Sequence, residues 1–147
     1  MTTPRLLASV ILFSLVPALW AQESGQVDPA SYVGMSISDL LGRLGTPASV
    51  YAVRGPEEWL DDVVFIYSEG DFYILKDRVW QVSVKTAYRI RVGDPESAAF
   101  LGLGEASVSS KEHAVFPLGW VNWPLAVRCN FNAAGRVSAI FIYRTDL

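Results

Sequence analysis

The 147-residue sequence contains one cysteine, Cys129, and one histidine, His113. A single cysteine excludes an intramolecular disulfide, so packing of apolar side chains must hold the fold together. One imidazole and one thiol do not make the usual ligand set of a zinc or other transition-metal site. Basic residues are also few, with 12 Lys and Arg against 15 Asp and Glu. This balance disfavours a nucleic acid or an anionic membrane as the partner.

Long apolar runs are missing as well. The longest stretch, Leu6 to Leu15, has about ten residues, whereas a membrane-spanning helix needs about 20. It follows Arg5 and precedes Ala18-Leu19-Trp20-Ala21, which has small residues at the two positions that a signal peptidase reads. We therefore predict that residues 1–21 are a cleaved signal peptide and that the protein is periplasmic or secreted, with no transmembrane segment. Gln22 stands where a lipoprotein has cysteine, so we expect no lipid anchor.

The chain nearly repeats itself. Gly34 to Gly45 and Gly93 to Gly104 have equal length and the same Leu-Gly ending, and Arg78-Val79 matches Arg136-Val137 at nearly the same spacing. We interpret this as two tandem units, residues 30–88 and 89–147, after a flexible tail at residues 22–29.

Each unit begins with a helix signal and continues with alternating strands. Ser36 is a good N-cap, Gly45 and Pro47 stop the first helix, and Asp94 is the expected cap of the second. Period-two runs joined by short turns then indicate antiparallel strands, and Thr86 to Val92 is expected to join the two sheets. The predicted fold is α+β: two tandem units, each a short helix packed on an antiparallel β-sheet. The expected strands are Val50–Val53, Val63–Tyr67, Phe72–Leu75, Val79–Lys85, Ala114–Phe116, Leu125–Phe131 and Arg136–Arg144.

Residues with chemical reactivity are sparse. Cys129 alternates with Leu125, Val127 and Phe131, so we expect a buried, inert thiol. A serine hydrolase triad drawn from Ser109 or Ser110 with His113 and Glu112 lacks the strained nucleophile turn, and an exposed polar loop is the preferred interpretation. We predict no catalytic residues, no metal site and no cofactor.

The acidic stretch Glu57 to Asp62 contains Trp59 and precedes a predicted strand. Four carboxylates could hold calcium, but the spacing is not that of an EF-hand loop and no glycine lies inside it. A solvated acidic loop is the ordinary explanation. A recognition loop that presents Trp59 is the alternative that we favour over a metal site.

Aromatic residues give the main functional signal. If Trp80, Val82 and Val84 face the helix, the outward positions of the last strand are Ala139, Phe141 and Tyr143, which are too apolar for a solvated face. Phe72 and Ile74 are expected to point outward too. Trp120 and Trp123 flank a loop that contains Pro and Gly. We predict a protein-binding face at Phe72, Phe141, Tyr143, Arg128, Trp59 and Trp120. The alternative is that these faces pack between the two units or against a second copy of the chain, as a homodimer.

Two short motifs carry a family resemblance. The segment Gly34-Met35 to Leu44-Gly45-Thr46-Pro47 and the hairpin Phe131 to Gly135-Arg136-Val137 resemble the superfamily of the outer-membrane assembly lipoprotein BamE (SmpA/OmlA) and the β-lactamase inhibitor proteins. The inhibitor proteins consist of two tandem helix-plus-sheet units, so the resemblance implies that fold. It also implies an assembly factor or an inhibitor as the role, although this chain has neither the lipidated cysteine of the first group nor the disulfides of the second.

We therefore expect a non-enzymatic protein that binds another envelope or secreted protein through an aromatic sheet face. One alternative is a small-molecule or lipid carrier that uses the same face as a ligand cleft. An enzyme is the other alternative, which the single histidine and the lack of a metal-ligand set disfavour.

Overall fold

The computed structural model describes residues 27–54, 62–120 and 122–147. The predicted signal peptide and Trp59 lie outside these residues. Within them no helix is long and apolar enough to cross a membrane. The elements are η1 (Pro29–Tyr32), α1 (Ile37–Leu44), β1 (Ser49–Val53), β2 (Asp62–Ile66), β3 (Asp71–Leu75), β4 (Arg78–Val84), β5 (Thr86–Ala87), β6 (Ile90–Arg91), α2 (Glu96–Leu103), β7 (Val108–Ser109), β8 (His113–Trp120), β9 (Pro124–Phe131) and β10 (Val137–Arg144).

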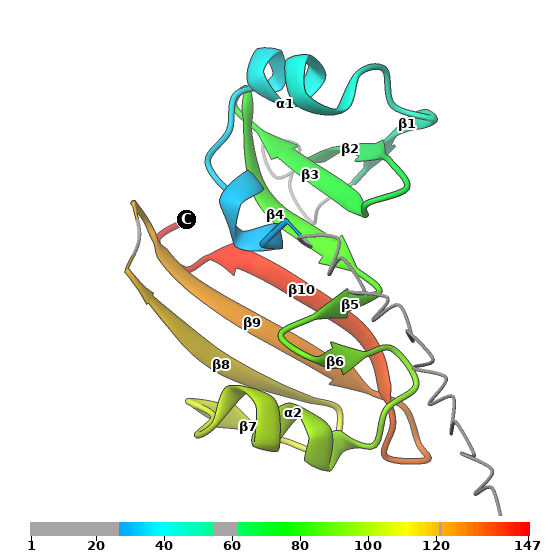
Figure 1. The fold of residues 1–147 in the computed structure, drawn as a ribbon, viewed down its shortest axis with the longest axis vertical. Coiled ribbons are helices and arrows are strands. Elements are labelled where there is room, and N and C mark those ends of the chain that lie inside the picture. Colours follow the sequence, from blue (N-terminus) through cyan, green and yellow to red (C-terminus); the bar gives the residue numbers. More distant parts are fainter. Residues whose placement is uncertain (1–26, 55–61, 121) are drawn as a thin grey trace, which may run out of the picture.

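Eight strands form a single antiparallel sheet in the order β1-β2-β3-β4-β10-β9-β8-β7. The fold class is therefore α+β and consists mostly of sheet. The first four strands and the last four are joined where β10 pairs with β4, with Phe141 opposite Ser83. Because β4 and β10 meet edge to edge, the outer faces of the two halves are continuous and do not pack on each other. Figure 1 shows this sheet running from β1 and β2 at the top to β7 and β8 at the bottom.

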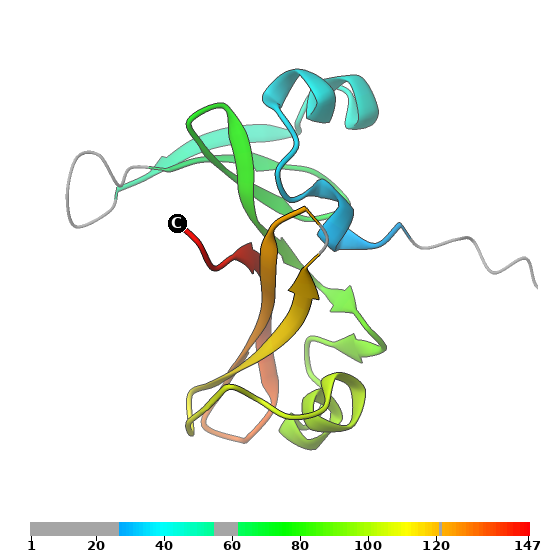
Figure 2. The ribbon, with the colours of Figure 1, turned by 90° about the vertical axis from the view of Figure 1, so that its left-hand side faces the viewer.

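The two helices and η1 lie on the same side of the sheet (Figure 2). Helix α1 begins as predicted, because the hydroxyl of Ser36 accepts a hydrogen bond from the Asp39 amide at 3.1 Å, and Gly45 ends it. The prediction that Asp94 caps the second helix is wrong. Its carboxylate instead accepts from the Arg91 amide at 2.8 Å, and Pro95 precedes the first residue of α2 without a side-chain cap.

The core lies between the sheet and the helices. The strand register aligns six apolar residues across this face, and Phe72 is fully buried among them. Cys129 lies on the same face and is fully buried, as predicted, and its burial raises the pKa of the thiol to about 11. The six aligned residues are Phe65, Phe72, Val82, Ile142, Val127 and Phe116.

The opposite side of the sheet is called the outer face here, and a β-bulge decides which residues reach it. Tyr73 pairs with Gln81, but the next position, Ile74, pairs with Val79, so Trp80 is the extra residue. The bulge reverses the alternation before Gln81 in β4. The prediction that Trp80 faces the helix is therefore wrong. The prediction that Phe72 and Ile74 point outward is wrong because both residues pair with buried valines of β4 and are themselves buried. Phe72 pairs with Val82 and must share its buried face.

Two further expectations need correction. Thr86 to Val92 does not connect two sheets but contains a separate hairpin of β5 and β6, with Tyr88 and Arg89 at positive φ. Asp28 and Pro29, which were predicted to belong to the flexible tail, are also held in place. Asp28 accepts hydrogen bonds from the Ala30 amide at 3.0 Å and from the Tyr88 hydroxyl at 2.9 Å. These bonds fix the start of η1 against the hairpin of β5 and β6.

The two halves make the same contacts at matching positions. Arg78 donates to the Gly34 carbonyl at 2.9 Å, and Arg136 donates to the Gly93 carbonyl at 2.8 Å. In each half the glycine amide donates to the carbonyl of the valine that follows the arginine, at 2.7 Å in both cases. The division into tandem units stays a prediction, and these paired contacts support it.

Candidate functional site

The outer face carries a row of rings that ends in an arginine. Tyr73 on β3 lies edge-on to Trp80 on β4, with ring centroids 6.4 Å apart, and edge-on to Phe141 on β10 at 6.5 Å. The guanidinium of Arg128 on β9 lies over the Phe141 ring, 4.7 Å from its centroid. All four side chains are half-buried. We call Trp80, Tyr73, Phe141 and Arg128 the aromatic row.

The row arises from strand register. Phe141 lies opposite both Ser83 and Arg128, because β10 is central and pairs on both sides. Tyr143, two residues further along β10, lies on the same face, opposite Gln81 and Ala126. Ser83 lies opposite Phe141 and Ala126 lies opposite Tyr143, and these small side chains do not cover the two rings. The predicted outward orientation of Phe141 and Tyr143 therefore agrees with the register.

A carboxylate borders the Trp80 end of the row. The indole Nε1–H of Trp80 donates to Oδ1 of Asp62 at 3.0 Å. Burial raises the pKa of the Tyr73 hydroxyl, and the nearby Tyr51, Asp71 and Asp62 raise it further, while Arg128 lowers it. The phenol of Tyr73 is therefore neutral at physiological pH. The face is polarised, with acidic groups near β2 and β3 and a cation on β9.

Arg128 is held by stacking and not by an ion pair. Among the described residues its Nε is enclosed and has no hydrogen-bond acceptor, and no carboxylate forms a salt bridge with its guanidinium. Its position is set by the Phe141 ring below it and by its β8 neighbour Val115. The protein's own described groups therefore do not saturate this cation.

The six predicted binding residues do not form one site. Phe141, Tyr143 and Arg128 share the outer face, whereas Phe72 belongs to the core. Trp120, with 80% of its surface exposed, lies at the end of β8, and the structure does not place it in the aromatic row. Trp59 falls outside the described residues.

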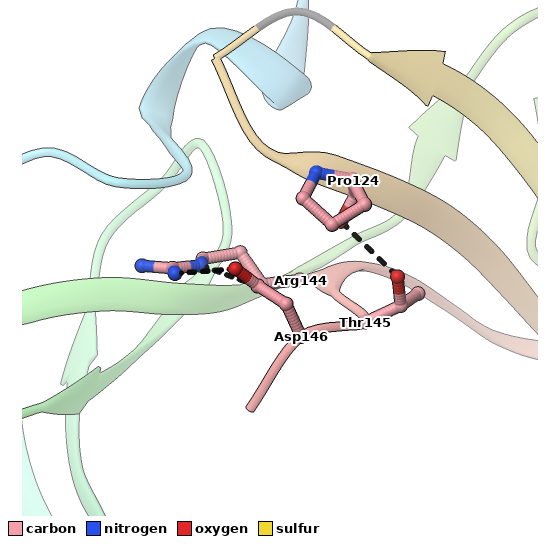
Figure 3. A network of polar contacts seen from close by, with 4 residues as sticks. All are labelled: Pro124, Arg144, Thr145 and Asp146. Atoms are coloured by element: carbon pink, nitrogen blue, oxygen red, sulfur yellow. Dashed lines mark hydrogen bonds and ion pairs between the residues drawn. The ribbon is translucent and has the colours of Figure 1, made fainter.

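Trp123 marks the same end of β8 and β9. The guanidinium of Arg144 lies 3.7 Å from the centroid of the Trp123 ring and donates two hydrogen bonds to Asp146, both at 2.9 Å. The Thr145 amide donates to the Pro124 carbonyl at 3.0 Å. The Thr145 hydroxyl donates to the same oxygen at 3.4 Å (Figure 3). This network holds the C-terminal residues at the start of β9, and it pairs the cation of Arg144 with the carboxylate of Asp146. It is a structural contact.

The region around His113 does not form a catalytic triad. The Ser110 hydroxyl accepts hydrogen bonds from the Glu112 and His113 amides, at 3.2 and 3.1 Å, which is the pattern of a serine that stabilises its own turn. It donates to the His113 carbonyl at 3.0 Å and lies 3.3 Å from His113 Nδ1. The geometry agrees with the polar-loop interpretation.

Two hollows flank the sheet. One, of about 800 Å³, lies on the core side between η1, the end of α1 and the turn before β3, and Tyr32, Phe72 and Lys85 contribute to its wall. The other, of about 960 Å³, lies at the start of β8, the end of β9 and the start of β10. Arg128, Asn130 and His113 line it together with Lys111, Glu112 and Glu96.

Sequence reasoning missed Tyr73, Trp80 and Asp62. The alternation expected for β4 places Trp80 on the core face, and the bulge turns it outward. Tyr73 was assigned to the wrong face for a different reason: Phe72 lies opposite Val82 on the core face, so regular alternation along β3 turns Tyr73 outward. The spacing of three apolar residues in β4 is the sequence signal that could have located the bulge. Val79, Val82 and Val84 cannot all be buried in an unbroken strand.

No protein-family model and no curated protein match the sequence. Solved structures do resemble it. A cysteine-rich secretory protein from Staphylococcus aureus has a TM-score of 0.54 at 12% identity, over 79% of this chain and 46% of that chain. An extracellular protein with an SCP domain from Bacillus anthracis also has 0.54, at 11% identity, over 93% and 50%. A DUF4309 family protein from Bacillus subtilis reaches only 0.43, at 11% identity over 75% and 78%.

The first two comparisons show a shared fold and no more, and this chain spans about half the length of those two proteins. They also correct one interpretation. The resemblance to BamE and the β-lactamase inhibitor proteins is not upheld, because the structures with TM-scores of 0.54 are a cysteine-rich secretory protein and an extracellular protein with an SCP domain. The two motifs behind it are a capped helix followed by glycine and a hairpin turn, which many α+β folds share.

Proposed function

We propose that this protein acts outside the cytoplasm by binding another protein through the outer face, with Phe141 and Tyr143 as the main contacts. The aromatic row is the observation that carries the proposal. Three rings and an arginine gather on the side of the sheet away from the described helices. Aromatic and arginine side chains are the types that dominate binding energy at protein interfaces.

The location belongs to the same proposal. The signal-like residues 1–21 motivate export, and the two structures with TM-scores of 0.54 are named as secretory or extracellular proteins, which is consistent with it. The proposed role is non-enzymatic, because the residues that could support catalysis, Ser110 and His113, are engaged in a turn.

A carrier function is the second candidate. Its ligand site would lie on the core side of the sheet and not on the aromatic face, where the sequence placed it. The hollow of about 800 Å³ lies on the core side and has Tyr32 and Phe72 in its wall, so a small ligand would bind there and not on the aromatic row. Native mass spectrometry of protein recovered from the producing cells tests this candidate, because a co-purified ligand would add a defined mass.

Differential capture tests the protein-binding proposal. Wild-type protein and the Phe141→Ala variant are used as baits against the proteins of the envelope and medium, and captured proteins are quantified. Proteins retained by the wild type and lost with Phe141→Ala are then measured for affinity by calorimetry. Truncation of an interface aromatic typically costs about 2 kcal/mol or more, or about 30-fold in affinity.

Leu101→Ala is the matched control, because Leu101 is an apolar residue on α2, on the opposite side of the sheet, with 88% of its surface exposed. It should retain every captured protein. If wild type, Phe141→Ala and Leu101→Ala capture the same set in equal amounts, the outer face is not the binding surface.

A further inference from the structure

Arg128 is the charged residue of the aromatic row, and it lacks a hydrogen-bond or ion-pair partner among the described residues. Its Nε is enclosed without an acceptor among the described residues. Glu96 and Glu112 line the same 960 Å³ hollow as Arg128, yet neither forms an ion pair with it. By contrast Arg78 and Arg136 donate to carbonyl oxygens, and Arg144 is paired with Asp146. A cation that is half-buried but unpaired carries a desolvation cost that a ligand can offset.

The stacking on Phe141 prepares this cation for one kind of ligand. The guanidinium carbon lies over the Phe141 ring, 4.7 Å from its centroid, and only Nε is enclosed, so the two terminal nitrogens remain able to donate. Carboxylate oxygens match the paired N–H groups of a guanidinium, and an ordered arginine loses less side-chain freedom when it binds one. An arginine held over an aromatic ring therefore favours a carboxylate over an uncharged polar group.

The surroundings indicate a carboxylate that belongs to a protein. Phe141 and Tyr73 lie on one side of Arg128, and Asn130 continues the face along β9 toward the polar hollow. An acidic side chain flanked by apolar residues would place its carboxylate on Arg128 and its neighbours on the rings. The acidic groups near Tyr73 would at the same time disfavour a second acidic residue at the other end of the row.

We propose that Arg128 is the specificity residue of the outer face and receives an aspartate or glutamate side chain of the partner protein, next to an apolar residue that contacts Phe141. This inference rests on the proposed function, because it assigns the partner's chemistry at the same face.

An unbiased displayed peptide library tests the inference even while the partner protein is unidentified. Protein recovered from the envelope fraction or medium is the bait. Peptides are selected on the wild type, and the enriched peptides are then measured for binding to Phe141→Ala. We expect enrichment of Asp or Glu at one position beside an aromatic or aliphatic residue. Arg128→Met, which keeps an unbranched side chain over the ring, should lower the affinity of such a peptide at least about tenfold.

Two controls separate the carboxylate contact from general loss of binding. For a peptide in which Gln replaces the selected Glu, Arg128→Met should change affinity less than about twofold. Arg128→Glu should shift the selected residue to Lys or Arg. Lys85→Met removes a cation from the other hollow and should change nothing.

The possible failures are distinguishable. Peptides that require Phe141 but show no acidic preference would overturn the Arg128 assignment and leave the proposed function intact. Acidic peptides that respond to Arg128→Met but not to Phe141→Ala would remove the aromatic row from the site and overturn the proposed function. Free phosphate or acetate binding as tightly as the peptides would identify a small anion as the ligand and overturn the inference. Absence of any enriched peptide would count against both.

Discussion

On the core side of the sheet, Phe72 is fully buried between the edge-on rings of Tyr32 and Tyr67, with centroids 5.1 and 5.4 Å away. On the outer face, Phe141 is half-buried between Tyr73 and Arg128. Both phenylalanines lie on central strands and have two aromatic or cationic neighbours. The difference lies in what stands above them, because the helices and η1 occupy only the core side (Figure 2).

This contrast separates residues that hold the fold from residues that are available to a partner. A β-strand offers alternate residues to opposite faces, and a single layer of helices can cover only one of them. The apolar rings on the other face stay half exposed to water, so they contribute less to folding and retain surface that binding can bury. Comparison of equivalent substitutions on the two faces measures that difference directly.

The largest expected effect is that of Phe72→Ala. Removal of a fully buried ring leaves a cavity under Tyr32 and Tyr67, and such truncations typically cost about 3–5 kcal/mol of stability. Phe141→Ala should cost clearly less, because its ring is already in contact with water. Chemical denaturation of both variants measures the two losses. Equal losses would mean that the outer face is as much a part of the core as the inner one.

The next effect concerns Cys129 and high pH. Burial raises the pKa of its thiol to about 11, above the value of about 8.5 for an exposed cysteine. The unfolded chain therefore forms the thiolate more easily. The contribution of Cys129 to stability is complete below about pH 8.5 and is lost as the pH rises through about 11, by about 3 kcal/mol.

Cys129→Ala provides the reference for this test, because every other effect of high pH on stability acts on both proteins alike. The difference in unfolding free energy between wild type and Cys129→Ala should shift against the wild type from pH 8 to pH 11. A thiol reagent should modify Cys129 in the denatured protein and not in the native protein. Rapid modification of the native protein would contradict the placement of Cys129 on the core face.

Much of the fold could be read from local signals. Ser36 and Gly45 bound α1 because capping chemistry is local, and the face of Cys129 follows from unbroken alternation along β9. The orientation of Phe141 and Tyr143 was predictable for the same reason, since β10 has no bulge between Ala139 and Arg144. These are the parts of the candidate site that sequence reasoning found.

The remaining parts depend on contacts between distant segments. The bulge at Trp80 results from fitting β4 to β3, and it turns Trp80 onto the outer face. The pairing of Phe72 with Val82 places Phe72 in the core and its neighbour Tyr73 on the outer face. The pairing of β4 with β10 brings Tyr73 within reach of Phe141, although the two residues are far apart in sequence. The hydrogen bond of Trp80 to Asp62 also follows from this arrangement. No pattern within a single strand encodes these relations.

The smallest expected effect compares two tyrosine hydroxyls, one on each side of the sheet. On the core side, the hydroxyl of Tyr67 donates to the Gly45 carbonyl at 2.9 Å, and burial raises its pKa. Tyr67→Phe removes that donor and should cost about 1 kcal/mol. On the outer face, the Tyr143 hydroxyl has no hydrogen-bond partner among the described residues, so Tyr143→Phe should change stability by less than about 0.5 kcal/mol. Both substitutions keep the ring, so differences in packing cancel and the comparison isolates the hydroxyl. Paired urea titrations of the two variants measure it. A loss for Tyr143→Phe as large as that for Tyr67→Phe would show that the hydroxyl of Tyr143 is bound within the protein, and Tyr143 would then be part of the fold and not of a surface available to a partner.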